Sequence, residues 1–247
     1  MSRLTAFNDL MVFGMTHPGL MRDKNEDSLF VNQELRIMSV ADGMGGAAAG
    51  EIASDIFMQT VKDLLKKPVT SQEQAIQLIK KIFLTANQSI IETARQNPHY
   101  KGMGCTAELL IFSHFGYVLG HVGDSRSYLF RQGDLKQMTK DHSVVQEQID
   151  QGLISAAEAS NHPLKNVIVR AVGTDESIAV DLIRGYYHTG DIFLLCSDGL
   201  HDMVPDETIT RILRTYESPE LMCQALIGMA NKAGGKDNIT VAIGQIK

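Results

Sequence analysis

The chain has 247 residues, a hydrophobic content of 44% and a formal net charge of −6 at pH 7. A core of ordinary size is expected, and the acidic balance without any Lys/Arg cluster argues against a nucleic acid or an anionic membrane as the main partner. No apolar run approaches the length that crosses a bilayer, and no leader pattern with a cleavage site is visible, so a cytoplasmic protein without membrane insertion is expected.

The first part of the chain predicts strands followed by two helices. Apolar and alternating runs predict three strands, at 12–15, 28–31 and 35–41. Apolar residues at helical spacing then predict a helix over 47–67 that ends at Pro68. A second helix is expected from the capping-box pair Ser71 and Gln74 as far as Asn97. Two consecutive amphipathic helices would cover one face of a sheet.

The middle of the chain has β character. Short strands separated by tight turns are expected at 106–112, 117–122, 127–130 and 135–138. Such close spacing is typical of antiparallel hairpins. The next passage, 143–161, is polar, weakly helical and divided by Gly152, which indicates a lid or flap.

The last part of the chain returns to strands and adds two more helices. Strands are expected at 178–183, 192–196 and 239–243, and helices begin at Pro205 and at Ser218. Helix pairs at two places with strands between them predict an α+β fold of four layers, α/β/β/α. In this sandwich two antiparallel β-sheets pack together and helices flank each of them. We expect residues 1–247 to form a single domain.

Carboxylates recur at the margins of these apolar runs. Four strand ends offer one each: Asp42, Asp124, Asp198 and Asp237. Glu26 and Asp27 lie at a strand margin of the same kind. Asp-Gly is a common turn dipeptide, so any one of these aspartates taken alone could be only a turn residue. Their joint occurrence favours a bound cation, because unpaired negative charges beside a core are costly.

The candidate ligands predict a hard divalent cation. Ligands that are all Asp or Glu suit Mg²⁺ or Mn²⁺ and disfavour histidine-rich zinc chemistry. Two such ions can share one carboxylate and one water, which becomes a hydroxide that attacks phosphorus. Asp42 is the expected bridge, because Gly43 lets the backbone turn so that its carbonyl can serve as another ligand. Asp198 and Asp237 would complete one ion.

Arg22 is the candidate phosphate clamp, because a guanidinium can hold two phosphate oxygens at once. The alternative is a surface ion pair with Asp23 or Glu26.

Six motifs occur in the order found in the protein phosphatase 2C family. They are Arg22-x-x-Asn25-Glu26-Asp27, Val40-Ala41-Asp42-Gly43-Met44-Gly45-Gly46, Gly120-His121-Val122-Gly123-Asp124-Ser125-Arg126, Lys140-Asp141-His142-Ser143, Ser197-Asp198-Gly199-Leu200 and Asp237-Asn238-Ile239-Thr240. From about residue 13 to residue 243, the chain closely resembles the short bacterial members of these metal-dependent serine/threonine phosphatases.

The resemblance implies a β-sandwich flanked by helices with a dinuclear Mg²⁺/Mn²⁺ site between the sheets. It further implies hydrolysis of phosphoserine and phosphothreonine by attack of a metal-bridging hydroxide, without a phospho-enzyme. Matched by motif, the metal ligands would be Asp42, the carbonyl of Gly43, Asp198 and Asp237. Glu26 and Asp27 would orient metal-bound water, and Arg22 would bind the phosphate. A third, weaker ion would be held by Asp124 with Asp198, and residues 143–170 would form the variable flap beside the cleft.

Two positions depart from the family pattern. Met44 stands where eukaryotic members carry a His that is a proposed general acid, and Ala47 stands where many bacterial relatives have His. His201 is a candidate substitute, although a plain loop residue is the preferred interpretation, and His121 and His142 are expected to be structural.

The expected substrates are phosphorylated proteins that serine/threonine kinases produce, and the expected state is a monomer. A catalytically inactive module that binds phosphoproteins is the alternative. A two-metal nuclease is disfavoured, because no basic groove is evident in the sequence.

Overall fold

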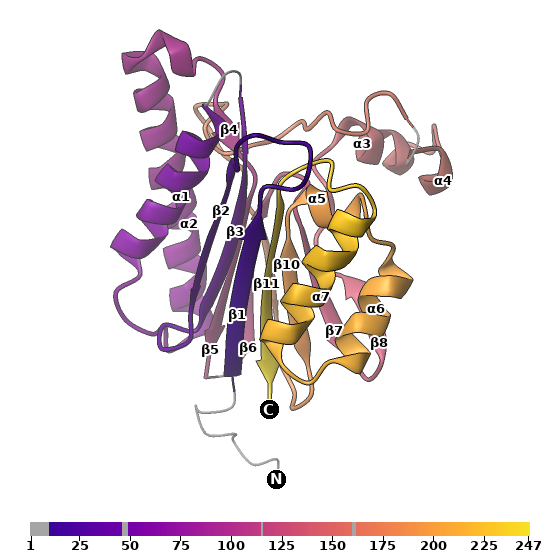
Figure 1. Cartoon of the computed structure of the whole chain (residues 1–247). Coiled ribbons are helices and arrows are strands. Elements are labelled where there is room, and N and C mark those ends of the chain that lie inside the picture. The colour runs from indigo at the N-terminus through magenta and orange to yellow at the C-terminus, as the bar shows by residue number, and fades with distance from the viewer. Residues whose placement is uncertain (1–9, 46–48, 115, 160–161) are drawn as a thin grey trace.

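A computed structural model describes residues 10–45, 49–114, 116–159 and 162–247. Two antiparallel sheets pack face to face, and helices cover the outer face of each (Figure 1). The expected α/β/β/α sandwich is therefore confirmed.

The first sheet collects the two ends of the chain. Its strand order is β1 (Leu10–His17), β11 (Ile239–Ile246), β10 (Ile192–Cys196), β7 (Arg126–Arg131) and β8 (Asp134–Gln137). The helices on its outer face are α6 (Asp206–Thr215) and α7 (Pro219–Lys232). Strand β10 shows the two-residue period of a sheet buried on both faces: Leu194 packs under these helices, whereas Phe193 and Leu195 face the other sheet.

The second sheet comes from the middle of the chain. Its order is β2 (Asp27–Asn32), β3 (Ile37–Met44), β5 (Ala107–Ser113), β6 (Gly116–Val122) and β9 (Asp181–Gly185), and β4 (Gly104–Cys105) pairs with β3. Helices α1 (Gly50–Leu64) and α2 (Gln72–Gln96) cover its outer face. A methyl group on Gly120 of β6 would overlap Ile79 and lie 3.0 Å from Phe83, so this glycine lets α2 approach the sheet closely.

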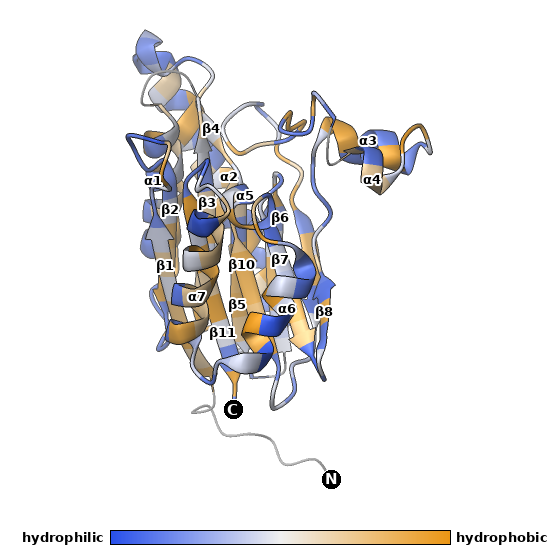
Figure 2. Cartoon of the chain, turned by 45° about the vertical axis from the view of Figure 1, so that its right-hand side comes forward, coloured by the Kyte–Doolittle hydropathy of each residue, from blue (hydrophilic) through white to orange (hydrophobic). Residues whose placement is uncertain are grey.

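Aromatic side chains fill the space between the two sheets. The ring of Phe193 lies 5.1 Å from that of Phe112 and 4.9 Å from that of Tyr117, both in edge-on geometry. Figure 2 shows the hydropathy behind this arrangement: the strands of the sandwich are largely apolar, and the outer helices turn polar residues to solvent.

The predicted helix starts are observed with one small difference. The hydroxyl of Ser71 accepts a hydrogen bond from the Gln74 amide at 3.1 Å, as a capping box requires. The side chain of Gln74 accepts from the amide of Thr70 at 3.0 Å, one residue before the position that the ideal motif uses. Ser218 caps α7 in the same way, accepting from the amide of Leu221 at 3.3 Å.

Two elements differ from the sequence prediction. The strand expected at 178–183 begins only at Asp181, because its partner β6 ends at Val122 and the ladder closes with His121 opposite Asp181. Asp198, which was expected at the end of a strand, begins the four-residue helix α5 (Asp198–His201) two residues after β10. A 3₁₀ turn, η1 (Pro98–Tyr100), follows α2.

The flap stands apart from the sandwich, as Figure 1 shows at its upper right. It contains the short helices α3 (Val144–Asp150) and α4 (Ala156–Ala159), as its weak helical pattern predicts. Its two ends are joined where Ser143 bridges Ile168 and the amide of Val144 donates to the carbonyl of Val167 at 2.9 Å. Among the described helices, none combines the length and the apolar character needed to cross a membrane.

Candidate active site

Acidic residues from both sheets meet at one end of the sandwich. Antiparallel pairing of β2 and β3 puts Asp27 directly opposite Asp42. On the other sheet, Asp198 follows β10 and Asp237 precedes β11, and these two strands are hydrogen-bonded neighbours. Residues far apart in sequence are thus brought together by the register of two pairs of strands.

The two sheets are joined at this point through Ser197. Its hydroxyl donates to the Oδ2 atom of Asp27 at 2.7 Å and accepts from the amide of Thr240 at 3.0 Å. Ser197 is completely buried. It was not singled out from the sequence, and its position directly before Asp198 is the only signal that could have indicated it.

Two carboxylate oxygens point into the site without a hydrogen bond. Within the described part of the chain, Oδ1 of Asp27 and Oδ1 of Asp198 are buried and have no hydrogen-bond partner. A buried carboxylate oxygen without a donor is costly, and a cation is one way to satisfy it. These two atoms, one from each side of the sandwich, are the site's clearest indication that it suits a cation.

The acidic groups also raise one another's pKa values. Burial raises the pKa of Asp42 well above its usual value, and the negative charges of Asp27, Asp198, Asp124 and Asp237 raise it further. Burial and the charge of Asp124 act in the same way on the pKa of Asp198. Burial is also the main reason why the pKa of Asp27 rises to about 6. Such mutual repulsion is what a cation would relieve.

The carboxylates do not yet form a closed ligand cage. In the ranges that the structure describes, no group of three or more His, Cys, Asp or Glu side chains is close enough to hold an ion as it stands. One of these carboxylates, that of Asp237, accepts from the guanidinium of Arg22 through Oδ2 at 2.7 Å. The electrostatic coupling shows that the carboxylates are neighbours, and their oxygen-only chemistry and two unpaired oxygens fit a hard divalent cation.

Arg22 forms an ion pair, but the partners predicted for it from the sequence are wrong. Its side chain is 55% exposed and pairs with Asp237, and not with Asp23 or Glu26. The bond to Asp237 is also the main reason why the pKa of Arg22 rises. Arg22 nevertheless lies at the edge of the acidic cluster, where a guanidinium could reach a phosphate.

Asn238 fixes the loop that carries Arg22 and Glu26. Its side-chain oxygen accepts from the amide of Glu26 at 2.8 Å, and its amide nitrogen donates to the carbonyls of Pro18 and Lys24 at 2.9 and 2.8 Å. Its own amide donates to Oδ1 of Asp237 at 2.8 Å. Burial raises the pKa of Glu26 itself. The motif Asp237-Asn238 is the sequence signal for this support.

Gly43 packs against the start of α1. A methyl group at this position would overlap the carbonyl oxygen of Gly50 and lie 2.6 Å from the carbonyl oxygen of Glu26. The amide of Gly43 donates to that same Glu26 carbonyl at 3.1 Å. Glycine is therefore required for the close approach of β3, the Glu26 loop and α1 beside Asp42.

Asp124 approaches the cluster from the end of β6. Burial, followed by the charge of Asp141, raises its pKa to about 7. Its backbone carbonyl accepts a hydrogen bond from Nε2 of His201 at 3.1 Å. A cavity of about 380 Å³ beside Asp124 and Asp198 extends under the flap, with Arg126 and Lys165 also in its wall.

Comparisons with known proteins decide the family. The family model described as protein phosphatase 2C matches residues 22–226. The chain belongs to the protein phosphatase 2C family.

Curated relatives carry the same activity in their names. The serine/threonine phosphatase stp of Listeria welshimeri is 37% identical over 233 residues, covering 92% of each chain. The serine/threonine protein phosphatase PstP of Mycobacterium tuberculosis is 38% identical over 231 residues, which cover 92% of this chain and 43% of that protein.

Solved structures agree with the fold. The crystal structure of the Mycobacterium tuberculosis phosphatase PstP/Ppp has a TM-score of 0.90 at 35% identity, covering 97% of this chain and 99% of that one. The catalytic domain of PstP in complex with two manganese ions has a TM-score of 0.88 at 34% identity, covering 96% of this chain and 98% of that one. The present chain is accordingly a protein serine/threonine phosphatase.

The two positions that depart from the family pattern, and the candidate substitute His201, can be compared with the structure. Met44 ends β3, and Ala47 lies outside the described residues. His201 is buried, and burial lowers its pKa to about 4, so its ring is neutral at pH 7. Because its Nε2–H is used on the Asp124 carbonyl, the structure favours a structural role for His201, which is the last residue of α5 and not the loop residue that was expected.

Proposed function

We propose that this phosphatase hydrolyses phosphoserine and phosphothreonine in proteins with two tightly bound divalent cations, Mn²⁺ or Mg²⁺. The proposed ligands are Asp42, Asp198, Asp237 and the carbonyl of Gly43. The observation that carries the proposal is the pair of buried, unpaired oxygens of Asp27 and Asp198 within a cluster of mutually repelling carboxylates. The PstP structure with two manganese ions supports the number of ions.

Such ions, when bound, would act as Lewis acids and would lower the pKa of a water, so that water could attack phosphorus directly without a phospho-enzyme. The protein's own part is to orient the reactants. Asp27 is held rigidly through Oδ2 by Ser197, which leaves its Oδ1 free to accept a hydrogen bond from a water. Glu26, held through its backbone by Asn238, is the second proposed acceptor for that water.

Arg22 is the proposed phosphate clamp. In this structure its guanidinium satisfies Asp237, which is a proposed metal ligand. A phosphate dianion would compete for the same guanidinium and offers it two oxygens in a bidentate arrangement. We propose that substrate binding transfers Arg22 from Asp237 to the phosphate, since both its exposure and its place beside the cluster permit this movement.

Asp124 is proposed to hold a third, weaker ion together with Asp198. The charge of Asp124 is the largest electrostatic influence on the pKa of Asp198 after burial, so the two carboxylates are near neighbours. The leaving serine or threonine oxygen needs a proton, and neither Met44 nor neutral His201 is suited to give one. Water held near Asp124 is the proposed source.

The proposed substrates are proteins phosphorylated by serine/threonine kinases. The cavity under the flap, between Asp124, Asp198 and Lys165, offers room for peptide residues next to the phosphorylated one. We treat residues 143–170 as the flap of one catalytic unit, acting in the cytoplasm as a monomer.

Turnover of a phosphothreonine peptide tests the proposal directly. Hydrolysis is expected with Mn²⁺ and is expected to stop with a chelator. Tight binding of the peptide without phosphate release at saturating Mn²⁺ would instead support the inactive phosphoprotein-binding alternative, which the retained aspartates do not favour.

A further inference from the structure

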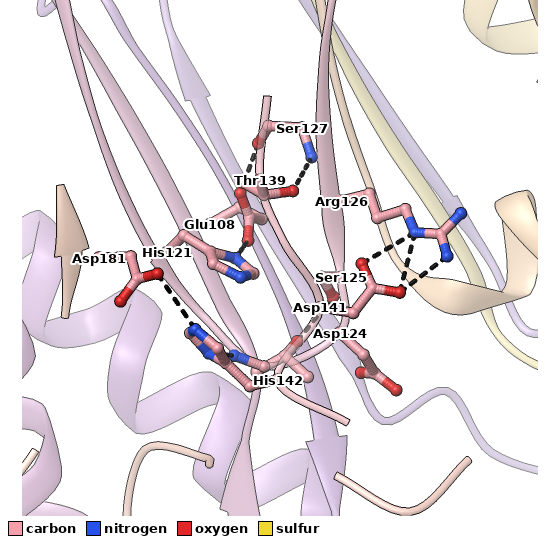
Figure 3. A network of polar contacts seen from close by, with 12 residues as sticks. Glu108, His121, Asp124, Ser125, Arg126, Ser127, Thr139, Asp141, His142 and Asp181 are labelled. Atoms are coloured by element: carbon pink, nitrogen blue, oxygen red, sulfur yellow. Dashed lines mark hydrogen bonds and ion pairs between the residues drawn. The ribbon is translucent and has the colours of Figure 1, made fainter. Parts of the chain in front are cut away.

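A buried polar network lies behind the Asp124 turn and takes no part in the mechanism above (Figure 3). Its centre is Glu108 of β5, which is completely buried between the sheets. One carboxylate oxygen contacts Nδ1 of His121 on β6, and the other accepts from the hydroxyl of Ser127 on β7. Since β5 and β6 belong to one sheet and β7 to the other, the network joins the two sheets directly.

The protonation of His121 follows from its second contact. Its Nε2 lies 2.9 Å from the carbonyl oxygen of Lys140, and because a carbonyl only accepts, this nitrogen must carry a proton. On the other side of the ring, a single proton is shared between Nδ1 and Glu108. The nearby charge of Glu108 raises the pKa of His121, and burial raises that of Glu108. Whether the shared proton lies on Nδ1 or on the carboxylate of Glu108, the pair has no net charge, and its two contacts fix the ring in place.

His142 packs on the face of this fixed ring. The two ring centroids are 4.6 Å apart with an angle of 35° between the planes. The Nδ1 atom of His142 accepts from the amide of Gly123 at 3.0 Å, and the backbone amide of His142 donates to the carbonyl of Gly123 at 2.7 Å. Gly123 has a φ of 113°, a conformation that needs glycine, and it directly precedes Asp124.

The opposite edge of the His142 ring faces the base of the flap. Because Nδ1 accepts, the proton of the neutral ring lies on Nε2, which donates to Oδ2 of Asp181 at 3.3 Å. Nη1 of Arg170 also lies 3.0 Å from Nε2, and since this nitrogen can only donate, it is a direct contact of the ring and not its hydrogen-bond partner. Arg170, the last flap residue, donates to the other oxygen of Asp181 at 2.9 Å. Burial, the charge of His121 and the charge of Arg170 together lower the pKa of His142 to about 4, which keeps the ring neutral.

The flap also returns to the backbone of His142. The amide of Val169 donates to the carbonyl of His142 at 2.8 Å, and Ser143, the next residue, bridges Ile168. Both ends of the flap therefore meet at this one residue. A single side chain is in contact with the Asp124 turn through one nitrogen and with the flap base through the other.

We propose that His142 is a positioning residue that ties the flap to Asp124. Its Nδ1 holds the Gly123–Asp124 turn, its Nε2 contacts both Asp181 and Arg170, and the Glu108–His121 pair forms the fixed surface behind it. The consequence for catalysis rests on the proposed function of Asp124 as a ligand of the weaker ion. A displacement of the flap base would then shift Asp124, and a loosened Asp124 turn would weaken that ion.

Two substitutions separate the two nitrogens. In His142→Asn, the amide oxygen can take the place of Nδ1 and accept from Gly123, but the side chain no longer reaches Asp181. In His142→Gln, the longer side chain can reach Asp181 with its amide nitrogen, but nothing remains at the Nδ1 position. His162→Gln is the matched control: this flap histidine also accepts a backbone amide through Nδ1, but that amide belongs to Leu164 of the flap, at 3.1 Å, and not to the Asp124 turn.

The first readout needs neither metal nor activity. Hydrogen exchange in the presence of EDTA is measured on peptides covering 118–126 and 143–159. We expect His142→Gln to speed exchange in 118–126, His142→Asn to speed it only in 143–159, and His162→Gln to leave 118–126 unchanged. Equal effects of the two His142 variants on both peptides, or no effect of either, would overturn the proposal.

The second readout is the Mn²⁺ concentration that gives half-maximal kcat on a phosphothreonine peptide, with Asp124→Asn as the reference. Loss of a residue that orients a ligand typically weakens a metal site about tenfold or more, so His142→Gln is expected to raise the midpoint about tenfold and His142→Asn less than about twofold. A midpoint in His142→Gln equal to that of wild type would contradict the tie to Asp124. If Asp124→Asn itself leaves the midpoint unchanged, the proposed ion at Asp124 fails, and the exchange data alone then decide whether the tie exists.

Should His142→Gln fail to fold, two milder variants keep the test open. Asp181 is 47% exposed, so Asp181→Ala removes the carboxylate that links Nε2 to Arg170 without disturbing the core, and it is expected to speed exchange in 143–159. Unchanged exchange there would refute the role of the contact between Nε2 and Asp181, and accelerated exchange of 118–126 in His142→Asn would refute the Nδ1 contact.

Discussion

Removing the metal is predicted to make the stability of this phosphatase fall as pH rises from 6 to 8. In the folded protein the pKa of Asp124 rises from 3.8 to about 7 and that of Asp27 to about 6. In the pH range between 3.8 and these raised pKa values, the folded chain therefore binds more protons than the unfolded chain. Stability contributed by such groups is lost as pH rises through the folded pKa.

The size of the effect follows from the same values. Between pH 6 and pH 8, Asp124 alone contributes about 1.4 kcal/mol in favour of the lower pH, and Asp27 about 0.4 kcal/mol. His142 and His201 act in the opposite direction, because their pKa values fall from 6.5 to about 4 and each costs about 0.8 kcal/mol at pH 6. These contributions nearly cancel.

Asp42 and Asp198 therefore set the sign. Their pKa values are raised well above 3.8, and both groups add stability at the lower pH. Asp124→Asn removes one titrating group while the histidines stay, so the difference between wild type and variant reports on this carboxylate together with its effect on the pKa values of Asp42 and Asp198. With about 2–4 °C per kcal/mol for a chain of this size, the pH 6 to pH 8 change in Tm should be about 4 °C larger in wild type.

Thermal melting with EDTA at pH 6 and pH 8 measures this change. Mn²⁺ at about 100 times its Kd should add about 2.7 kcal/mol to the free energy of unfolding at pH 8, where the carboxylates repel one another most strongly in the absence of the ion. A chelated wild type that is less stable at pH 6 than at pH 8, or the same pH dependence in Asp124→Asn, would refute the account of the carboxylate cluster.

Three further predictions follow from single contacts. Arg22→Ala is expected to raise KM for a phosphopeptide, and to lower kcat as well if the guanidinium tightens on the transition state; unchanged kinetics would exclude the clamp. Asn238→Ala should raise KM and lower Tm, because the carbonyls of Pro18 and Lys24 and the amide of Glu26 lose their partner, and normal values of both would show that the loop is held by other contacts. Gly120→Ala should cost about 1–3 kcal/mol by overpacking against Ile79 and Phe83, whereas Gly228→Ala in α7, with open space around it, should be neutral or stabilising; equal denaturation midpoints for the two would contradict the packing of α2 on β6.

Local patterns in the sequence predicted the fold well because the signals are short in range. Ser71 and Ser218 cap helices exactly where the pattern places them, and the strand alternation of Phe193, Leu194 and Leu195 defines two buried faces. Residues 178–180 were wrongly assigned to a strand, because their apolar character serves packing and the end of a ladder depends on the partner strand.

Contacts between distant residues could not be predicted in this way. Arg22 pairs with Asp237, 215 positions away, and Glu108 pairs with Ser127 across the two sheets. The residues around Glu108 in the sequence do not indicate that its carboxylate is buried, because the groups that hydrogen-bond to it, His121 and Ser127, lie on other strands. The family motifs indicated the acidic residues, and only the fold shows that burial and mutual repulsion act on them together.

The central claim is that aspartates from both sheets hold the cations used in hydrolysis, and Asp198→Asn tests it most directly because this residue faces both Asp42 and Asp124. Hydrolysis of a phosphothreonine peptide at saturating Mn²⁺ is measured together with the number of tightly bound ions. The account predicts a fall in kcat of at least about 100-fold, consistent with several kcal/mol of lost transition-state stabilisation, and fewer than two tight ions in a protein that still melts cooperatively. Activity within about threefold of wild type, with two ions retained, would contradict it.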